Sequence, residues 1–317
     1  SRDFLLNSSD LSDDPNFKYD YLVELIQNTT HKHIILSILE KINHLVMNSK
    51  DLSTKLLQNE DLHKTFLVMN DKHEVRNKYS QMIIRAIDNV DRPDLYLTFM
   101  EHLLDSGSRK HRNEVGYPLI HIVEKYPNKL DPEKWLDITF NHINNIKLSE
   151  TERTKINFSS LIDSIRLMIL LPQISPESRE KYRNMTFDMK FFGNLFKSKF
   201  NCRSLFNLLL IFKGDTAIMN NFFGTMKNGW DGISPHSAAL YFSMLVLLND
   251  ESSDENFEWF FKSIKKKPDA FIESFIEELE SSTVDGMSTV FVNHSKLWIK
   301  PFLLSLSEKV RMNLNNL

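Results

Sequence analysis

Cys202 is the only cysteine in the 317-residue sequence and the first residue to consider as a nucleophile. Lys199 and Arg203 are close to it in the sequence, and neighbouring cations lower the pKa of a thiol. Cys202 also opens the apolar stretch 205–212, where a cysteine is typically a small core residue. Because no base stands at a recognisable spacing from it, we interpret Cys202 as structural and expect no catalytic residue in this chain.

The other clusters of reactive side chains also favour structural roles. His31, His33 and His44 form the densest histidine group, but residues two apart point to different sides of a helix, and no cysteine or acid completes a zinc spacing. The glutamates of the acidic stretch 273–280 alternate with apolar residues, as on a solvated helix face. With only 8 glycines, the sequence contains no glycine-rich phosphate loop. We therefore expect no metal and no cofactor.

Aromatic residues and cations alternate between Phe187 and Phe261, which is typical of a surface that binds a peptide or stacks on nucleic-acid bases. Most of these phenylalanines recur at helical spacing and are expected to pack between helices. They include Phe187, Phe191, Phe192, Phe196, Phe200, Phe206 and Phe212. The cations that we expect to contact a partner are Lys197, Lys199 and Arg203.

A second basic cluster, Arg109-Lys110-His111-Arg112, follows the link 105–108. Such clusters are commonly exposed helix ends, where cations interact favourably with the helix dipole. Contact with nucleic acid is the alternative. Arg109 and Arg112 are therefore included among the candidate partner-binding residues.

Trp230 lies between Asn228-Gly229 and Asp231-Gly232, two turn signals that predict a loop. A tryptophan held on a short anchored loop can bury a large apolar area on binding, so we predict that Trp230 is an exposed interface anchor. The alternative, that Trp230 folds back onto the phenylalanine-rich helices, stays open.

The elements that position these residues are predicted to be helices. Apolar residues recur at spacings of three and four, as from Ile34 to Val46 and from Val75 to Val90, and no sustained period of two indicates a strand. We expect helices at 17–28, 31–48, 60–69, 72–90, 93–105, 110–126, 132–145, 150–171, 176–184, 187–198, 202–213, 215–228, 235–249, 254–265, 268–281, 284–293 and 296–316.

Several prolines mark helix starts. Asp131-Pro132, Ser175-Pro176 and Ser234-Pro235 each place a capping side chain before a proline, whose missing N–H costs nothing at the first helical position. Pro118 and Pro301 instead lie inside apolar-periodic stretches and are expected to kink or end their helices.

Many helices joined by short polar links favour an all-α fold, an irregular α-solenoid of stacked antiparallel helix pairs. We divide the chain into a flexible lead-in at 1–16, an N-terminal helical-repeat half at 17–172 and a C-terminal phenylalanine-rich half at 173–317. The seam is placed near 172–178 because the apolar residues change there from Ile, Leu and Val toward Phe. Two halves of one array and a separate second subdomain both fit this change.

The stretch 71–76, Asp-Lys-His-Glu-Val-Arg, is followed by an apolar stripe and resembles the second helix of a HEAT or armadillo repeat. Ser307-Glu308-Lys309-Val310-Arg311 looks like a second copy. The resemblance implies a solenoid in which Arg76 reaches a carboxylate or carbonyl of the neighbouring repeat.

The same array also resembles, more faintly, the non-catalytic helical regions of very large ubiquitin-specific proteases. No catalytic motif of that family can be placed on this chain, because its cysteine box is absent around Cys202. The resemblance implies an accessory segment of a large enzyme.

Charge and cysteine content bound the function. The formal net charge of -3 gives no global field to attract nucleic acid or anionic lipid, and no apolar run reaches the length of a membrane span. A single cysteine favours the cytoplasm or the nucleus. We expect a non-catalytic scaffold that binds a protein or peptide, as a fragment of a larger intracellular protein. The alternatives are an accessory region of a ubiquitin-specific protease and, in third place, a helical nucleic-acid-binding module.

Overall fold

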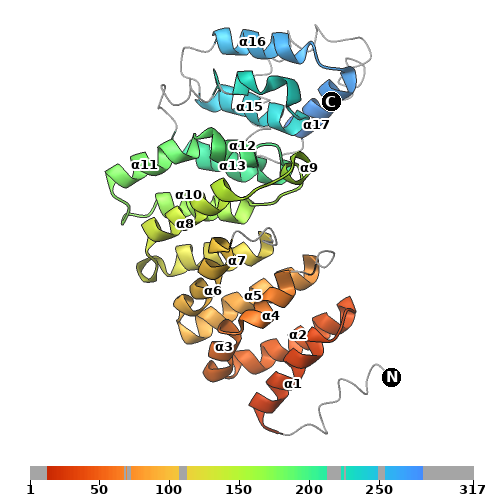
Figure 1. Cartoon of the computed structure of the whole chain (residues 1–317), viewed down its shortest axis with the longest axis vertical. Helices are drawn as coiled ribbons and strands as arrows, with labels where there is room; N and C mark the ends of the chain where they lie inside the picture. Colours follow the sequence, from red (N-terminus) through yellow and green to blue (C-terminus); the bar gives the residue numbers. More distant parts are fainter. Residues whose placement is uncertain are drawn as a thin grey trace. The chain divides into compact units, whose positions relative to one another are not determined.

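The computed structural model describes residues 13–67, 69, 73–106, 113–212, 223–224, 226–248 and 254–280, and every regular element within them is a helix (Figure 1). The expected all-α class is therefore confirmed for the described residues. The chain divides into two compact units, Ser1–Ile138 and Thr139–Leu317. The seam expected near 172–178 falls inside the second unit, between helices that belong to the same body.

The first unit is built from successive short helices (red to yellow in Figure 1). They are α1 (Pro15–Gln27), α2 (Lys32–Met47), α3 (Lys50–Leu57), α4 (Glu60–Leu67), α5 (His73–Val90), α6 (Pro93–Asp105), α7 (Asn113–Lys125) and the 3-10 turn η2 (Pro127–Lys129), and α8 (Pro132–Asn145) begins in this unit.

Helix α5 is the centre of the first unit, because it packs against α2, α3 and α7. The apolar stripes predicted for α2 and α5 face this core. Their buried members are Ile35, Ile38, Leu39, Ile42, Val46, Val75, Tyr79, Met82, Ile83, Ala86 and Ile87. The burial follows from the spacing of three and four, which places these side chains on one face of each helix.

Arg76, in the stretch that resembles a HEAT or armadillo repeat, is 7% exposed. Its guanidinium donates a hydrogen bond to the carbonyl of Met69, in the link between α4 and α5. This bond is local, within the link that leads into α5, and it does not test the contact with a neighbouring repeat that the resemblance implied.

The second unit holds the remaining described elements. They are α9 (Glu150–Arg153), α10 (Ser159–Ile169), α11 (Pro176–Thr186), α12 (Met189–Leu195), η3 (Lys199–Asn201), α13 (Cys202–Leu210), η4 (Trp230–Gly232), α15 (Pro235–Leu248), α16 (Asp254–Ile264) and α17 (Asp269–Glu280). Helix α15 is buried on all sides from Ser237 to Leu245 and packs against α13, α16 and α17, so it forms the core of this unit.

Side chains mark the helix starts as the sequence predicted. The Asp131 carboxylate accepts from the Lys134 N–H at 3.1 Å, and the Ser175 hydroxyl accepts from the Ser178 N–H at 3.0 Å. The Ser234 hydroxyl accepts from the N–H of Ser237 at 3.3 Å. All three predicted caps are confirmed, because such a cap depends only on residues within one turn.

Three helix assignments differ from the expectation. Helix α3 was not predicted, and the helix expected at 150–171 is divided into α9 and α10 by a link at 154–158. Pro118 lies inside α7 and does not end it. A proline within a helix removes one backbone donor without requiring the helix to stop.

Candidate protein-binding surface

The link between α12 and α13, residues 195–203, is called the α12–α13 corner. Asn201 is completely buried in it. The Asn201 side-chain amide donates to the carbonyl of Leu195, the last residue of α12, at 3.1 Å. Its carbonyl oxygen accepts from the backbone N–H of Phe158, which precedes α10, at 2.8 Å. One buried side chain therefore joins the end of α12 to the start of α10.

The three carbonyls that follow Leu195 in the chain also accept hydrogen bonds from side chains. Ser237 of α15 donates its hydroxyl to the carbonyl of Phe196 at 2.6 Å. His236 Nε2 donates to the carbonyl of Lys197 at 3.1 Å, and the Cys202 thiol points at that of Ser198 with a sulfur–oxygen distance of 3.6 Å. A helix end leaves such carbonyls without partners inside the helix. At this corner, each of four consecutive carbonyls is bonded.

Phe200 projects from this anchored backbone and is 48% exposed. The Lys199 ammonium lies 5.6 Å from the centre of the Phe200 ring, and Lys199 itself is exposed. The packed position expected for Phe200 is therefore wrong. The other large apolar side chains that are exposed among the described residues are Phe17, Met47 and Leu170.

Of the three predicted cations, Lys199 and Arg203 are exposed and Lys197 is half-buried. All three lie within residues 195–203, the α12–α13 corner. The charge of Arg203 acts on Asp163 of α10: burial raises the pKa of the Asp163 carboxyl above its usual range, while a hydrogen bond from Ser204 and the charges of Arg166 and Arg203 oppose that rise. Lys199, which lies over the exposed ring, is the cation best placed to meet a partner.

The thiol of Cys202 is 4% exposed, and its pKa is raised to about 12 by burial and by the negative charge of Glu278. Such a thiol is protonated at neutral pH, whereas a nucleophilic cysteine needs its thiolate. The structural interpretation of Cys202 agrees with this environment.

Trp230 does not lie on an exposed loop. It is 7% exposed, and its ring contacts Trp259, Phe260 and Tyr241 at centroid distances of 5.1, 5.5 and 5.8 Å. The Lys267 ammonium covers the ring at 5.7 Å and donates to the Trp230 carbonyl at 3.0 Å. The predicted exposure is wrong because aromatic side chains of α15 and α16 provide a pocket for the indole. The alternative left open by the sequence, in which the tryptophan folds back, is confirmed.

The remaining candidates cannot be placed. Arg109 and Arg112 lie outside the described residues, as do Pro301 and the second Val-Arg copy at 307–311.

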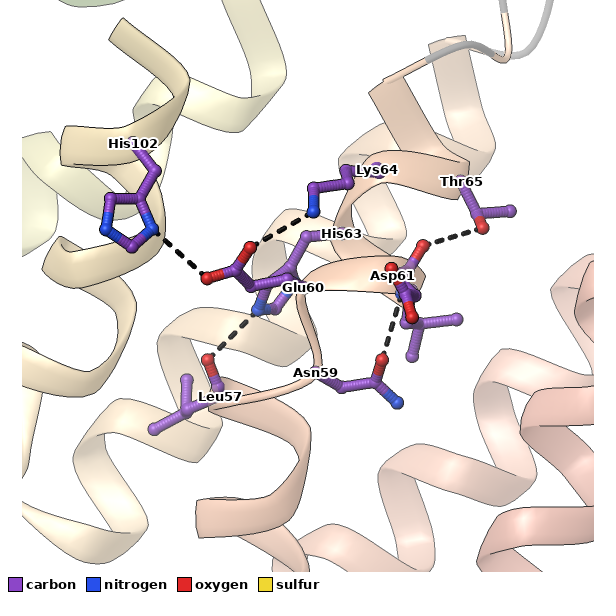
Figure 2. A network of polar contacts seen from close by, with 9 residues as sticks. Leu57, Asn59, Glu60, Asp61, His63, Lys64, Thr65 and His102 are labelled. Carbon is purple, nitrogen blue, oxygen red and sulfur yellow. Dashed lines mark hydrogen bonds and ion pairs between the residues drawn. The ribbon is translucent and has the colours of Figure 1, made fainter. Parts of the chain in front are cut away.

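A second anchored link joins α3 to α4 in the first unit, and residues 57–63 are called the α3–α4 corner. Figure 2 shows His63 directed at the carbonyl of Leu57, the last residue of α3, with a nitrogen–oxygen distance of 3.0 Å. Asn59 accepts from the N–H of Leu62 at 3.0 Å and so caps α4. The exposed residues of this corner are Gln58 and Asp61, both of which are polar.

The hydrogen bonds of His63 determine its tautomer. A carbonyl only accepts, so Nε2 must carry the hydrogen that points at Leu57, and Nδ1 is left to accept from the Tyr79 hydroxyl. His63 is 2% exposed and its ring lies against Tyr96 and Phe99 of α6. Burial lowers the pKa of His63 to about 4, so the ring is neutral at pH 7.

Glu60 carries the charged contacts at the surface of this corner. Its carboxylate accepts from Lys64 at 3.1 Å and contacts His102 of α6 at 3.2 Å (Figure 2). These hydrogen bonds lower the pKa of the Glu60 carboxyl. Exposed ion pairs of this kind contribute little stability, and nothing at this corner offers an apolar surface to a partner.

No group of histidine, cysteine or acidic residues in the described part of the chain is arranged to hold a metal ion. Among the helices that the structure describes, none combines the length and the apolar character needed to cross a bilayer. Comparison of the sequence and structure with protein-family models, curated proteins and solved structures gave no match. Function is therefore inferred from the residues of this chain alone.

Proposed function

We propose that this chain is a non-catalytic helical-repeat scaffold that binds a protein partner at the α12–α13 corner. The observation that carries the proposal is the half-exposed ring of Phe200 on a backbone whose four carbonyls at 195–198 are all bonded. An apolar side chain held on a rigid support loses little entropy when it is covered, which is typical of residues that dominate interfaces.

In this proposal the helices form an irregular α-solenoid of HEAT or armadillo character. Support comes from the pattern of helix packing within the first unit, where α1 packs on α2, α2 on α3 and α5, and α5 on α7. Solenoids are built from such contacts between elements that are near in sequence. The buried Cys202 thiol supports a role without catalysis, and a single cysteine suits an intracellular protein.

Affinity capture with quantitative mass spectrometry tests the proposal. Phe200→Ala should weaken capture of a direct partner by about 2 kcal/mol, because the ring is the centre of the surface. Leu170→Ala is the matched control, since Leu170 is also an apolar residue of the second unit and is 52% exposed, and we expect capture to be unchanged. A set of captured proteins that is the same for wild type and Phe200→Ala would contradict this site.

A further inference from the structure

The corner pairs an apolar ring with a cation, and this pairing indicates the chemistry of its partner. Resting on the proposed function, we infer that the partner segment is an acidic peptide with an apolar side chain next to its carboxylates. The apolar side chain covers Phe200, and a carboxylate contacts the Lys199 ammonium 5.6 Å from that ring. Lys197, half-buried in the same corner, adds a second positive charge.

The hydrogen bonds of the corner favour a partner that brings acceptors. The backbone carbonyls of residues 195–198 already accept from Asn201, Ser237, His236 and Cys202. What remains at the surface for recognition is the set of side chains, and lysine and arginine donate but cannot accept. A carboxylate supplies an acceptor for the exposed Lys199 ammonium and forms the stronger, charge-assisted type of hydrogen bond.

The neighbouring charges favour a peptide over single-stranded nucleic acid, which would also combine stacking with negative charge. Asp163 and Glu278 both lie near this corner, as their interactions with Arg203 and Cys202 show. A continuous phosphate backbone would meet these carboxylates and would need more cations than the three at this corner. A peptide can place its few carboxylates at the lysines alone.

Fluorescence anisotropy with the full chain tests the inference. The probe is a short labelled peptide in which glutamates flank a central phenylalanine, and it is compared with two analogues: one with glutamines for glutamates and one with alanine for phenylalanine. A labelled oligothymidylate is the nucleic-acid probe. We expect the acidic phenylalanine peptide to bind about tenfold or more tightly than either analogue and than the oligothymidylate.

Substitutions in the protein test the acidic character of the partner separately from the proposed binding of a protein at this corner. Lys199→Glu should weaken the acidic peptide about tenfold or more, whereas Lys262→Glu, the same charge change on an exposed lysine of α16, should leave it unchanged.

Equal binding of the glutamine analogue, tighter binding of oligothymidylate, or no binding of the acidic peptide would overturn the inference. If Phe200→Ala still weakens capture of a protein partner in any of these cases, the proposed function stands and only the acidic character of the partner is wrong.

Discussion

The two corners close their helix ends with the same device. In each, a buried polar side chain six residues later bonds the carbonyl of the last residue of the preceding helix: His63 bonds Leu57, and Asn201 bonds Leu195. Each also uses its second polar atom to reach another element. His63 accepts from a hydroxyl of α5, and Asn201 accepts from the N–H of Phe158.

The corners differ in what they present and in whether their anchor titrates. The exposed residues of the α3–α4 corner, Gln58 and Asp61, are polar, whereas the α12–α13 corner exposes the apolar ring of Phe200. Histidine gains a proton in acid, and asparagine does not. The buried anchor has a structural role at both corners. The binding role proposed for the α12–α13 corner depends instead on its exposed residue, Phe200.

The largest expected effect comes from breaking the anchor of the α12–α13 corner. Asn201→Ala leaves the buried N–H of Phe158 without its partner, whereas the carbonyl of Leu195 loses one of two bonds and keeps the one from the Ser198 N–H at 3.3 Å. Since an unpaired buried group costs up to about 3 kcal/mol and a single lost hydrogen bond about 1 kcal/mol, we expect a loss of up to about 4 kcal/mol in the stability of the second unit. Hydrogen exchange with peptide resolution measures it in α10, α12 and α13.

The matched control for that variant is Asn48→Ala. The Asn48 amide also donates to a carbonyl at a helix end, that of His44, at 2.8 Å, but it is exposed. Water can replace this bond, so the loss should stay below about 1 kcal/mol. Equal effects of the two substitutions would show that Asn201 does not hold the corner.

A somewhat smaller effect should follow from acidification, at the α3–α4 corner, whose anchor is a histidine. The pKa of His63 is lowered from 6.5 to about 4, so between these values the unfolded chain binds a proton that the folded chain does not. Stability from this residue is complete above pH 6.5 and falls by about 3 kcal/mol as the pH decreases to 4. Hydrogen-exchange protection factors in α3, α4 and α5, which correct for the slower intrinsic exchange at acidic pH, should fall accordingly.

His63→Phe should remove this acid sensitivity, although the variant starts from a lower stability because Leu57 and Tyr79 lose their partner. His33→Phe, at an exposed position of α2, should keep the full loss. The carboxyls of Glu60, Asp88 and Asp94, whose pKa values are lowered, lose their stabilising effect at more acidic pH and mark the lower limit of the useful range. An unchanged pH profile in His63→Phe would contradict the assignment.

The smallest expected effect on stability is that of Phe200→Ala. Because the ring is 48% exposed, its removal should change the free energy of unfolding by less than about 0.5 kcal/mol. Denaturant unfolding measures this directly. A large loss would mean that the ring packs within the unit, and the α12–α13 corner would then, like the α3–α4 corner, offer no apolar surface to a partner.

Local sequence signals predicted the helices well, and tertiary contacts account for the main differences. The caps at Asp131, Ser175 and Ser234 and the stripes of α2 and α5 are local features, and all are present. Helix α3 has only eight residues, too short for its apolar spacing to be recognised, although Ser49 caps it. The division between α9 and α10 lies beside a bond from Asn201, 43 residues away from Phe158, which no local pattern contains.

The candidate surface was predicted only in part, for a related reason. The cations at 197–203 were recognised by their clustering, which is visible in the sequence. The burial of Trp230 and the exposure of Phe200 were not predicted. Helical spacing and turn signals indicate which residues lie near a helix face, but not which neighbouring side chains cover them. The rings of α15 and α16 cover the tryptophan, whereas no ring contact covers the phenylalanine among those that the structure describes.

The buried thiol of Cys202 allows opening of the α12–α13 corner to be measured by the rate of its alkylation. The chain has one cysteine, so an alkylating reagent reports on a single position. With a pKa of about 12 and 4% exposure, the sulfur reacts only during moments when the corner opens, and the labelling rate counts those openings. A partner that covers Phe200 should slow alkylation of Cys202. Binding can therefore be followed on the native chain without any substitution.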